Sequence, residues 1–134
     1  MARSWPFLPW RPEPPTPAPT ELGRRAERAA ARYLQRRGLR LIARNYRTRV
    51  GEIDLVMTDG SELVFVEVRF RSRADFGDGA ETIDQKKQQR IARAARHYLL
   101  HRTSDETPCR FDVVSVSRTN YLLRFEWIQD AFTP

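Results

Sequence analysis

A β-hairpin near the middle of the chain constrains the fold more than any other feature of the sequence. Two runs in which apolar and polar residues alternate, Glu52–Met57 and Glu62–Arg71, are separated by a short segment that contains Asp59-Gly60. An Asp-Gly pair between alternating runs is a strong signal for a two-residue turn. We therefore expect these runs to pair as antiparallel strands.

The register of this hairpin decides which side chains share a face. If the Asp-Gly pair occupies the centre of the turn, Asp54 faces Phe65 and Glu52 faces Glu67. Asp54 and Glu67 are then diagonal neighbours, about 7 to 8 Å apart at the backbone, which is close enough for two carboxylates to bind one cation. Arg69 extends the same face. A one-residue bulge would move Glu67 to the other face.

The two faces of the hairpin differ in composition. One face is wholly apolar and is expected to be buried; it carries Ile53, Leu55, Met57, Val64, Val66 and Val68. The other face combines aliphatic and aromatic residues with charged ones, namely Glu52, Asp54, Val56, Leu63, Phe65, Glu67 and Arg69. A solvated face rarely has so many apolar side chains, and a core face rarely has so many charges.

Two interpretations of the charged face remain open. Glu52, Asp54 and Glu67 would repel one another, and their pKa values would rise unless a cation compensates. A hard divalent ion such as Mg²⁺ binds carboxylate oxygens and keeps several waters. The alternative is a ladder of cross-strand ion pairs on an exposed face, to which Arg49 and Arg69 contribute the cations.

Helical patterns flank the predicted hairpin. The first predicted helix runs from Glu21 to Arg37, with Thr20 as its N-cap and Gly38 as its stop. The second helix follows a glycine-bearing loop over residues 72–81, and its start is indicated by the capping-box spacing of Thr82 and Gln85.

The remaining strands complete the predicted order α-β-β-β-α-β-β, which is an α/β (α+β) fold with a mixed sheet flanked by helices. Strand Arg40–Asn45 precedes the hairpin. After the second helix come Cys109–Ser117, a turn at Arg118–Tyr121 and a last strand, Leu122–Ile128.

Proline usage and chain length predict the domain organisation. Seven of the nine prolines precede residue 20, so residues 1–19 are expected to form an extended flexible tail and residues 20–134 a single domain. No apolar run approaches the ~20 residues of a membrane span. A single cysteine, Cys109, rules out an internal disulfide and favours the cytoplasm; it is expected to be a packed thiol.

The charge of the chain favours an anionic partner. The formal net charge is +7, and only Lys86 and Lys87 among the 24 basic residues are lysines. Arginine binds phosphate oxygens in a bidentate manner, which suits nucleic acid, although a coding bias would give the same excess. The candidate nucleic-acid-binding residues are Arg24, Arg25, Arg71, Lys86, Lys87 and Arg90.

Polar residues on both helices are further candidates for a site. Lys87 and Gln88 lie one turn before Ile91 on the apolar stripe of the second helix, where they could orient a water or a phosphate or simply form an exposed first turn. Glu27 lies at the edge of the first helix's apolar stripe, where it could reach the hairpin or pair with Arg24 or Arg28.

Other motifs give weaker signals. His97 and His101 have a metal-ligand spacing, but no third ligand lies nearby in the sequence. We find no P-loop, no dinucleotide-binding fingerprint and no Ser-His-Asp pattern.

Several motifs taken together resemble a known family. They are Gly51-Glu52-Ile53-Asp54-Leu55-Val56, the run Val64–Arg71, Lys87-Gln88 and Cys109–Val114. With Gly23 and Glu27, Arg44-Asn45 and the run Trp127–Phe132, they resemble the YraN-like family of uncharacterised bacterial proteins over about residues 20–134. That family is similar to the restriction-endonuclease-like superfamily, which includes archaeal Holliday-junction resolvases.

The resemblance implies a metal-dependent endonuclease fold with an α-β-β-β-α-β core. It implies that Asp54 and Glu67 bind Mg²⁺ or Mn²⁺, with Glu27 or Glu52 assisting. The implied substrate is DNA, branched or single-stranded. Resolvases work as dimers, so a homodimer is one assembly that the resemblance suggests, although no interface is evident in the sequence.

One position departs from the superfamily's pattern. Arg69 stands where active nucleases usually have lysine, and Gln88 matches the polar residue of the second helix. Arginine stays protonated, so it cannot act as a general base, although it could position water or stabilise charge in the transition state. The competing hypothesis is therefore a module that binds nucleic acid or protein without cleaving it; a weaker one is recruitment of a protein through the proline-rich tail.

Overall fold

The computed structural model describes residues 20–71, 83–104 and 106–134. The order of elements is α-β-β-β-α-β-β, which confirms the predicted α+β fold. The elements are α1 (Glu21–Arg36), β1 (Arg40–Thr48), β2 (Gly51–Asp59), β3 (Glu62–Arg71), α2 (Gln85–Arg102), β4 (Cys109–Thr119) and β5 (Leu122–Ile128). The predicted tail over residues 1–19 and the predicted loop over residues 72–81 lie outside the described residues.

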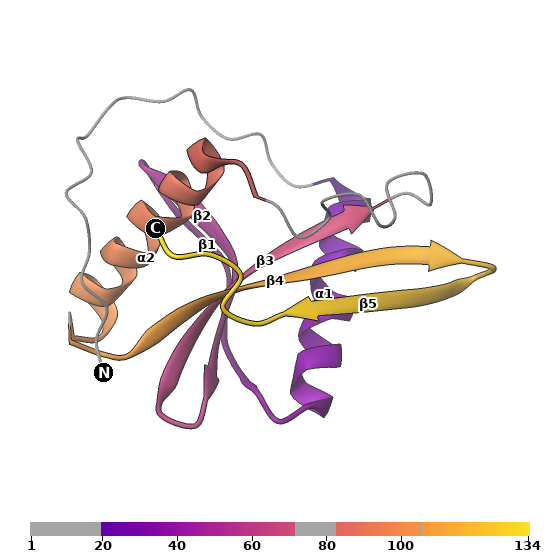
Figure 1. The fold of residues 1–134 in the computed structure, drawn as a ribbon, viewed down its shortest axis with the longest axis horizontal. Coiled ribbons are helices and arrows are strands. Elements are labelled where there is room, and N and C mark those ends of the chain that lie inside the picture. Colours follow the sequence, from indigo (N-terminus) through magenta and orange to yellow (C-terminus); the bar gives the residue numbers. More distant parts are fainter. Residues whose placement is uncertain (1–19, 72–82, 105) are drawn as a thin grey trace.

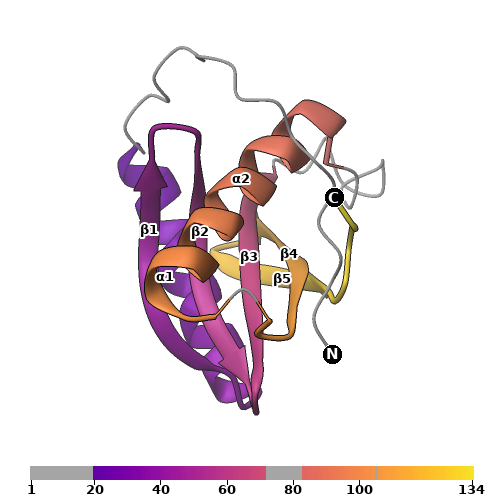
Figure 2. The same cartoon turned by 90° about the vertical axis from the view of Figure 1, so that its left-hand side faces the viewer.

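The five strands form one mixed sheet in the order β1-β2-β3-β4-β5. The pairs β1–β2, β2–β3 and β4–β5 are antiparallel, and β3–β4 is parallel. A parallel pair needs a long crossover connection, and α2 lies within it. Figure 1 shows the elements, and in Figure 2 α2 lies in front of the sheet while α1 lies behind it. The helices therefore cover opposite faces.

Each helix packs on its own apolar core. Small residues of α1, including Ala30 and Ala31, allow it to lie close to Leu55, Met57 and other aliphatic residues of the sheet. The α2 side has a core that includes Phe65, Phe111, Ile91 and Leu99. Alternation along the strands sends successive side chains to the two cores, as the hairpin pattern predicted.

Ile53 is the exception. It was expected on the same face as Leu55 and Met57, but it packs in the α2-side core with Val56. The expectation is wrong because the alternation breaks between Ile53 and Leu55. Ile53 pairs with Tyr46 of β1, and both pack in the α2-side core, beside Asn45, whose φ of 51° departs from regular strand geometry.

The hairpin register differs from the predicted one by two residues. Asp59 pairs with Glu62, so the turn is centred on Gly60 and Ser61 rather than on Asp59 and Gly60. Gly60 has a φ of 62°, as the first central residue of a type II′ turn requires. A shift of two residues preserves the alternation, so the paired residues from Leu55 onward keep their predicted faces.

Arg110, on β4, explains why the turn forms one residue later. Its Nη1 lies 3.0 Å from Asp59 Oδ2 and 2.9 Å from Glu62 Oε1, which holds these two carboxylates opposite each other at the strand ends. Arg110 Nε also donates to Asp112, which is 0% exposed and accepts further hydrogen bonds from Trp127 Nε1 and the Asp130 amide. This buried network ties the hairpin turn to β4 and β5.

The helix ends follow from local capping. Thr20 accepts a hydrogen bond from the Gly23 amide at 3.0 Å, which confirms it as the N-cap of α1. The helix ends at Arg36, one residue before the predicted end, and Gly38 has a φ of 101°, typical of a helix stop. The N-cap of α2 is Asp84 rather than Thr82, which lies outside the described residues.

Three strands are longer than predicted. β1 continues past Asn45 to Thr48, although Asn45 has a φ of 51°, β2 extends beyond Glu52–Met57 at both ends, and β4 continues to Thr119. Asparagine tolerates this left-handed conformation better than most residues, so the strand is not interrupted. Within the described residues, neither helix is sufficiently long and apolar to span a membrane.

Candidate functional site

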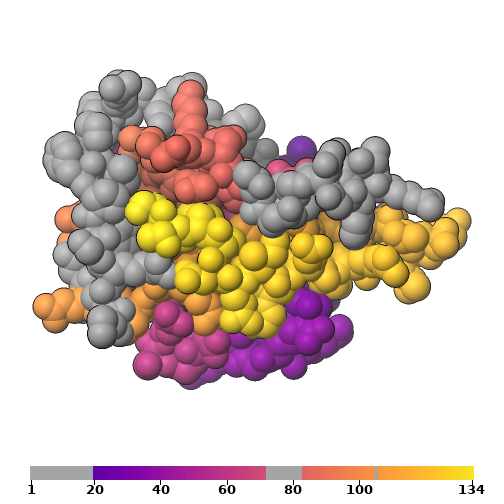
Figure 3. Space-filling view, viewed as in Figure 1, coloured from indigo at the N-terminus to yellow at the C-terminus, as the bar shows by residue number. Residues whose placement is uncertain are grey.

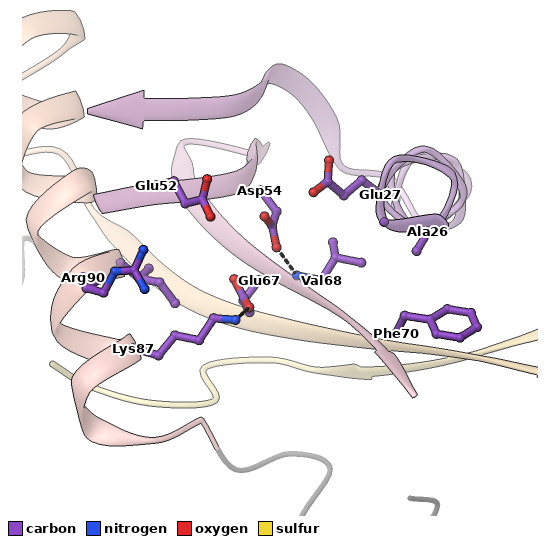
Figure 4. A pocket seen from close by; sticks show the side chains of 11 residues that line it. Ala26, Glu27, Glu52, Asp54, Glu67, Val68, Phe70, Lys87 and Arg90 are labelled. Carbon is purple, nitrogen blue, oxygen red and sulfur yellow. Dashed lines mark hydrogen bonds and ion pairs between the residues drawn. The ribbon is translucent and has the colours of Figure 1, made fainter. Parts of the chain in front are cut away.

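The candidate site lies where β2 and β3 separate. Their last pair at this end is Leu55 with Val66, and the same register continued by one residue brings Asp54 opposite Glu67. Asp54 and Glu67 are therefore opposite each other rather than diagonal as predicted. The Val68 amide donates a hydrogen bond to Asp54 Oδ2 at 2.8 Å (Figure 4). At the point where the strands separate, a carboxylate of β2 thus takes the place of a backbone carbonyl as the acceptor.

A cavity of about 260 Å³ occupies this fork. Residues of both helices and both strands line it, because the gap between the strands is open to the α1 side and to the α2 side. The lining residues are Gly23, Ala26, Glu27, Glu52, Asp54, Glu67, Val68, Phe70, Lys87, Arg90 and Ile91. Figure 4 shows the carboxylates of Glu27, Glu52, Asp54 and Glu67 around the cavity.

Glu67 and Lys87 form the closest charged pair of the site. Glu67 is only 5% exposed, and its Oε2 lies 2.6 Å from Lys87 Nζ. Lys87 is in the first turn of α2, and half of its side chain is exposed. Lys87 thus combines the two expectations for it, since it lies in an exposed first turn and also contacts a hairpin residue. The predicted exposed ion-pair ladder is wrong for Glu67, because this residue is buried and its contact is with Lys87.

Glu27 enters the site from α1. It is 8% exposed and its carboxyl group hydrogen-bonds with the side chains of Asn45 and Asp54. Arg28, an alternative partner of Glu27, instead pairs with Glu21, since Arg28 Nη2 lies 3.5 Å from Glu21 Oε1. Glu27 therefore reaches toward the hairpin, which is one of the two positions expected for it.

Burial makes the carboxyl groups weaker acids. Desolvation is the main cause that raises the pKa of Asp54 to about 6, and it also raises the pKa of Glu27. Desolvation, followed by repulsion from Asp54, raises the pKa of Glu67 to about 8. The cluster therefore retains a proton near neutral pH, and additional positive charge would stabilise its ionised carboxylates.

Lys87 supplies part of that charge. Burial lowers its pKa, but attraction by Glu67 and the hydrogen bond between them outweigh this, so its pKa is raised overall. Lys87 therefore remains an ammonium group at neutral pH, which can donate hydrogen bonds but not accept them.

Gly51 sets the position of α2 against the site. A Cβ atom at Gly51 would lie 1.9 Å from the backbone carbonyl oxygen of Arg90, so no other residue fits without moving the helix. This close approach keeps Arg90 and Lys87, one turn apart, over the fork. The sequence reasoning used Gly51 only as part of a motif and missed this packing role.

Glu52 lines the outer part of the cavity. Its Oε2 lies 3.1 Å from Arg47 Nε, on the neighbouring strand β1. Arg47 was not among the predicted partners of Glu52. This exposed ion pair is weak, so Glu52 remains available to the cavity.

Two predicted catalytic residues are not among the side chains that line the cavity. Gln88 Nε2 donates to the Ile83 carbonyl at 2.8 Å, which fixes the chain before α2. Arg69 is half-buried on β3, and its charge is close enough to lower the pKa of Lys87. Both lie beside the site, and their proposed catalytic roles stay predictions.

The donor set fits a metal that needs few protein ligands. Within residues 20–71, 83–104 and 106–134, no three His, Cys, Asp or Glu side chains are grouped to hold an ion. Mg²⁺ is commonly bound through one or two carboxylates while water completes its coordination. The half-buried Asp54 and the buried Glu67 are two carboxyl groups of the kind that such a cation binds, and at Glu67 the ion would have to share the carboxylate with the Lys87 ammonium group.

The candidate nucleic-acid-binding residues are spread over three elements. Arg24 and Arg25 are exposed on α1, and Lys86 is exposed on α2. Arg71 and Arg90 are half-buried, and Arg90 lines the cavity. Binding of nucleic acid by these residues stays a prediction.

The histidine pair has a structural role. The rings of His97 and His101 stack with centroids 4.0 Å apart, and His97 Nδ1 lies 2.5 Å from the Tyr46 hydroxyl. No group of three potential metal ligands occurs in the part of the chain that the structure describes, so the zinc interpretation has no support here.

Asn45 and Phe70 were not chosen as site residues from the sequence. Asn45 hydrogen-bonds Glu27, and its positive φ is the local irregularity that turns its side chain toward α1. Phe70 lines the cavity beside Val68. Asn45 was named only as part of the Arg44-Asn45 motif of the family resemblance, and nothing distinguished Phe70 from a core residue.

Comparison with known proteins identifies relatives over most of the chain. The model of Uncharacterised protein family UPF0102 matches residues 26–116. A UPF0102 protein of Nitrosococcus oceani is 49% identical over 112 residues, which cover 82% of this chain and 90% of that protein. A UPF0102 protein of Methylobacillus flagellatus is 50% identical over 113 residues, covering 84% and 97%. One of Nitrosospira multiformis is 51% identical over 110 residues, covering 82% and 91%.

Proposed function

The chain belongs to Uncharacterised protein family UPF0102, and we propose that it is a metal-dependent nuclease that cleaves DNA at the fork between β2 and β3. One observation carries the proposal. The half-buried Asp54 and the buried Glu67 each lie one position beyond the last pair of β2 and β3, Leu55 with Val66, and an ammonium group lies 2.6 Å from Glu67. Carboxylates and a cationic side chain around one cavity are what phosphodiester hydrolysis requires.

Asp54 and Glu67 would hold Mg²⁺ or Mn²⁺, with Glu27 or Glu52 assisting. When bound, the ion supplies charge neutralisation and lowers the pKa of a water molecule. Both carboxyl groups have raised pKa values chiefly because they are desolvated, so a divalent cation would stabilise their ionised forms. Burial also raises the pKa of the Glu27 carboxyl, on the other wall, which makes it a stronger base than an exposed glutamate and a candidate to accept a proton from water.

Lys87 would supply a lysine cation at this site. Its ammonium group reaches the carboxylate cluster from α2, and it would stabilise the charge that develops on the phosphate oxygens. Because Lys87 also stays protonated, neither it nor Arg69 would serve as the general base. Arg69, beside Lys87, would add positive charge without exchanging protons.

A cleavage assay tests the proposal. Purified protein is incubated with labelled duplex, single-stranded, flap and four-way DNA, with and without Mn²⁺. We expect Mn²⁺-dependent products that fall at least about 100-fold in Asp54→Asn and Glu67→Gln and about 10- to 100-fold in Lys87→Ala. Glu126→Gln, an exposed carboxylate on β5, is the matched control and should cleave normally.

The assay also addresses the non-cleaving alternative. If wild type, Asp54→Asn and Glu67→Gln give the same products, the cleavage arises from a contaminant and the chain is not the nuclease. Binding of DNA that survives loss of both carboxylates and weakens with salt would then identify a binding module. A cytoplasmic location and a homodimer belong to the same proposal, and size-exclusion chromatography tests the latter.

A further inference from the structure

A second cavity, of about 330 Å³, lies between α1 and the β4–β5 hairpin. One wall carries Arg25, Arg28 and Arg32 of α1, and the other carries Arg118 and Tyr121 near the tip of the hairpin. We call this cavity the arginine groove. None of its cations belongs to the carboxylate site described above.

The arginine groove adjoins the carboxylate cavity. Ala26 and Phe70 line both, so the two cavities share a wall. A chain-like ligand longer than the groove would have to pass over this wall to reach Asp54 and Glu67. Figure 4 shows Ala26 and Phe70 at the side of the cavity that is away from Lys87.

The charge of the groove suits a polyanion. Arg25, Arg28 and Arg32 are three and four residues apart, so they project from one side of α1, and all are exposed. Glu21 compensates only part of this charge, at 3.4 Å from Arg25 and 3.5 Å from Arg28. With Arg118 on the facing wall, a strand of phosphates would meet arginines on both sides.

The tip of the hairpin presents an aromatic ring that the fold does not need. Tyr121 is 97% exposed, and it has a φ of 68° after Asn120 with a φ of 49°. Two positive φ values characterise a type I′ turn, whose second position favours glycine, so tyrosine is strained here. In Figures 1 and 3 the hairpin reaches outward from the body of the described residues. A strained, fully exposed ring is a feature expected for contact with a ligand.

We propose that the arginine groove binds an unpaired DNA strand, with Tyr121 stacking on a base and the arginines on the phosphates; this substrate class rests on the proposed nuclease function. Stacking on an aromatic side chain needs an unstacked base, which a regular duplex does not offer. The groove then guides the strand past Phe70 toward the carboxylates.

Binding is measured by fluorescence anisotropy with a labelled oligo-dT and a labelled duplex of equal length, in EDTA so that no cleavage occurs. We expect Tyr121→Gly to weaken oligo-dT binding about tenfold and duplex binding less than about twofold. Tyr121→Phe keeps the ring and should bind like wild type. Tyr121→Gly should also raise the melting temperature by about 2 to 5 °C, because glycine relieves the strain, so lost binding is not lost folding.

The arginines are tested by their salt dependence. Arg32→Ala with Arg118→Ala should reduce the slope of log affinity against log salt for oligo-dT by about 1.4. The control, Arg40→Ala with Arg96→Ala, removes the same charge from exposed positions outside the groove and should change the slope less. Normal oligo-dT binding by Tyr121→Gly, or an equal effect of both double variants, overturns the proposal.

Competition and cleavage separate the remaining outcomes. Displacement of labelled oligo-dT by poly-glutamate as effectively as by unlabelled oligo-dT would mean a general acidic ligand and would also overturn the proposal. If Asp54→Asn cleaves like wild type while Tyr121→Gly loses oligo-dT binding, the proposed nuclease function is wrong and the proposed strand-binding role of the groove is supported. If cleavage depends on Asp54 but Tyr121→Gly binds oligo-dT normally, only the strand-binding role is wrong.

Discussion

Replacing Glu67 by glutamine is expected to stabilise the metal-free protein, and the gain should grow with pH. The fold raises the pKa of Glu67 from 4.5 to about 8, chiefly because the carboxyl group is buried. The folded state therefore keeps a proton that the unfolded chain releases. Stability from this group is fully present below pH 4.5 and is lost as the pH rises through 8.

The size of the effect follows from that shift. At about 1.4 kcal/mol for each unit, a rise from 4.5 to about 8 corresponds to roughly 5 kcal/mol at pH 9. Glutamine resembles the protonated acid and carries none of this cost. Loss of the contact with Lys87 subtracts little, on the order of 1 kcal/mol or less, because half of the lysine side chain already lies in water.

Urea unfolding, followed by tryptophan fluorescence in EDTA, measures the effect at several pH values from 5 to 9. The free energy of unfolding of Glu67→Gln should approach that of wild type near pH 5 and exceed it by several kcal/mol at pH 9. Glu126→Gln, an exposed control, should differ from wild type by less than about 0.5 kcal/mol throughout. A difference between Glu67→Gln and wild type that is constant with pH would refute the reasoning.

Three further outcomes test other parts of the structure. Millimolar Mn²⁺ at pH 8 should raise the melting temperature of wild type by a few degrees but not that of Asp54→Asn, as differential scanning fluorimetry would show. Gly51→Ala should lower stability by about 2 kcal/mol or more and abolish cleavage, because its Cβ would lie 1.9 Å from the Arg90 carbonyl oxygen; unchanged urea unfolding would contradict this packing. Asp112→Ala should cost about 3 to 5 kcal/mol in urea unfolding, because Arg110 Nε, Trp127 Nε1 and the Asp130 amide all lose their acceptor; a loss below 1 kcal/mol would not fit.

Local signals in the sequence were sufficient for the elements. The hydroxyl of Thr20 caps a helix whose small apolar residues recur at helical spacing, so α1 needed no tertiary information. The alternation in β2 and β3 also placed Asp54 and Glu67 on one face. A shift of two residues does not alter that face, which is why the pairing of these carboxylates was foreseen despite the wrong turn.

Contacts from distant segments account for what the sequence did not reveal. Arg110 holds Asp59 and Glu62 opposite each other from about 50 residues away. Turn preferences depend on neighbouring residues only, so they could not predict this contact. The same applies to Gly51, whose close contact with Arg90 exists only once α2 packs on β2. The turn that contains Tyr121 was predicted, but the exposure of its ring was not, because exposure cannot be deduced from alternation.

The network around Asp112 also has a consequence for the order of folding. Asp112 accepts hydrogen bonds from Trp127 and from the Asp130 amide, 15 and 18 residues later in the chain. Until that later segment docks, β4 would bury a carboxylate whose hydrogen bonds are incomplete, which is unfavourable. The parallel pairing of β4 with β3 should therefore be completed late, after the hairpin of β2 and β3 has formed from local contacts. Asp54 and Glu67 would face each other early in folding, whereas the surface that leads a ligand to them would be assembled last.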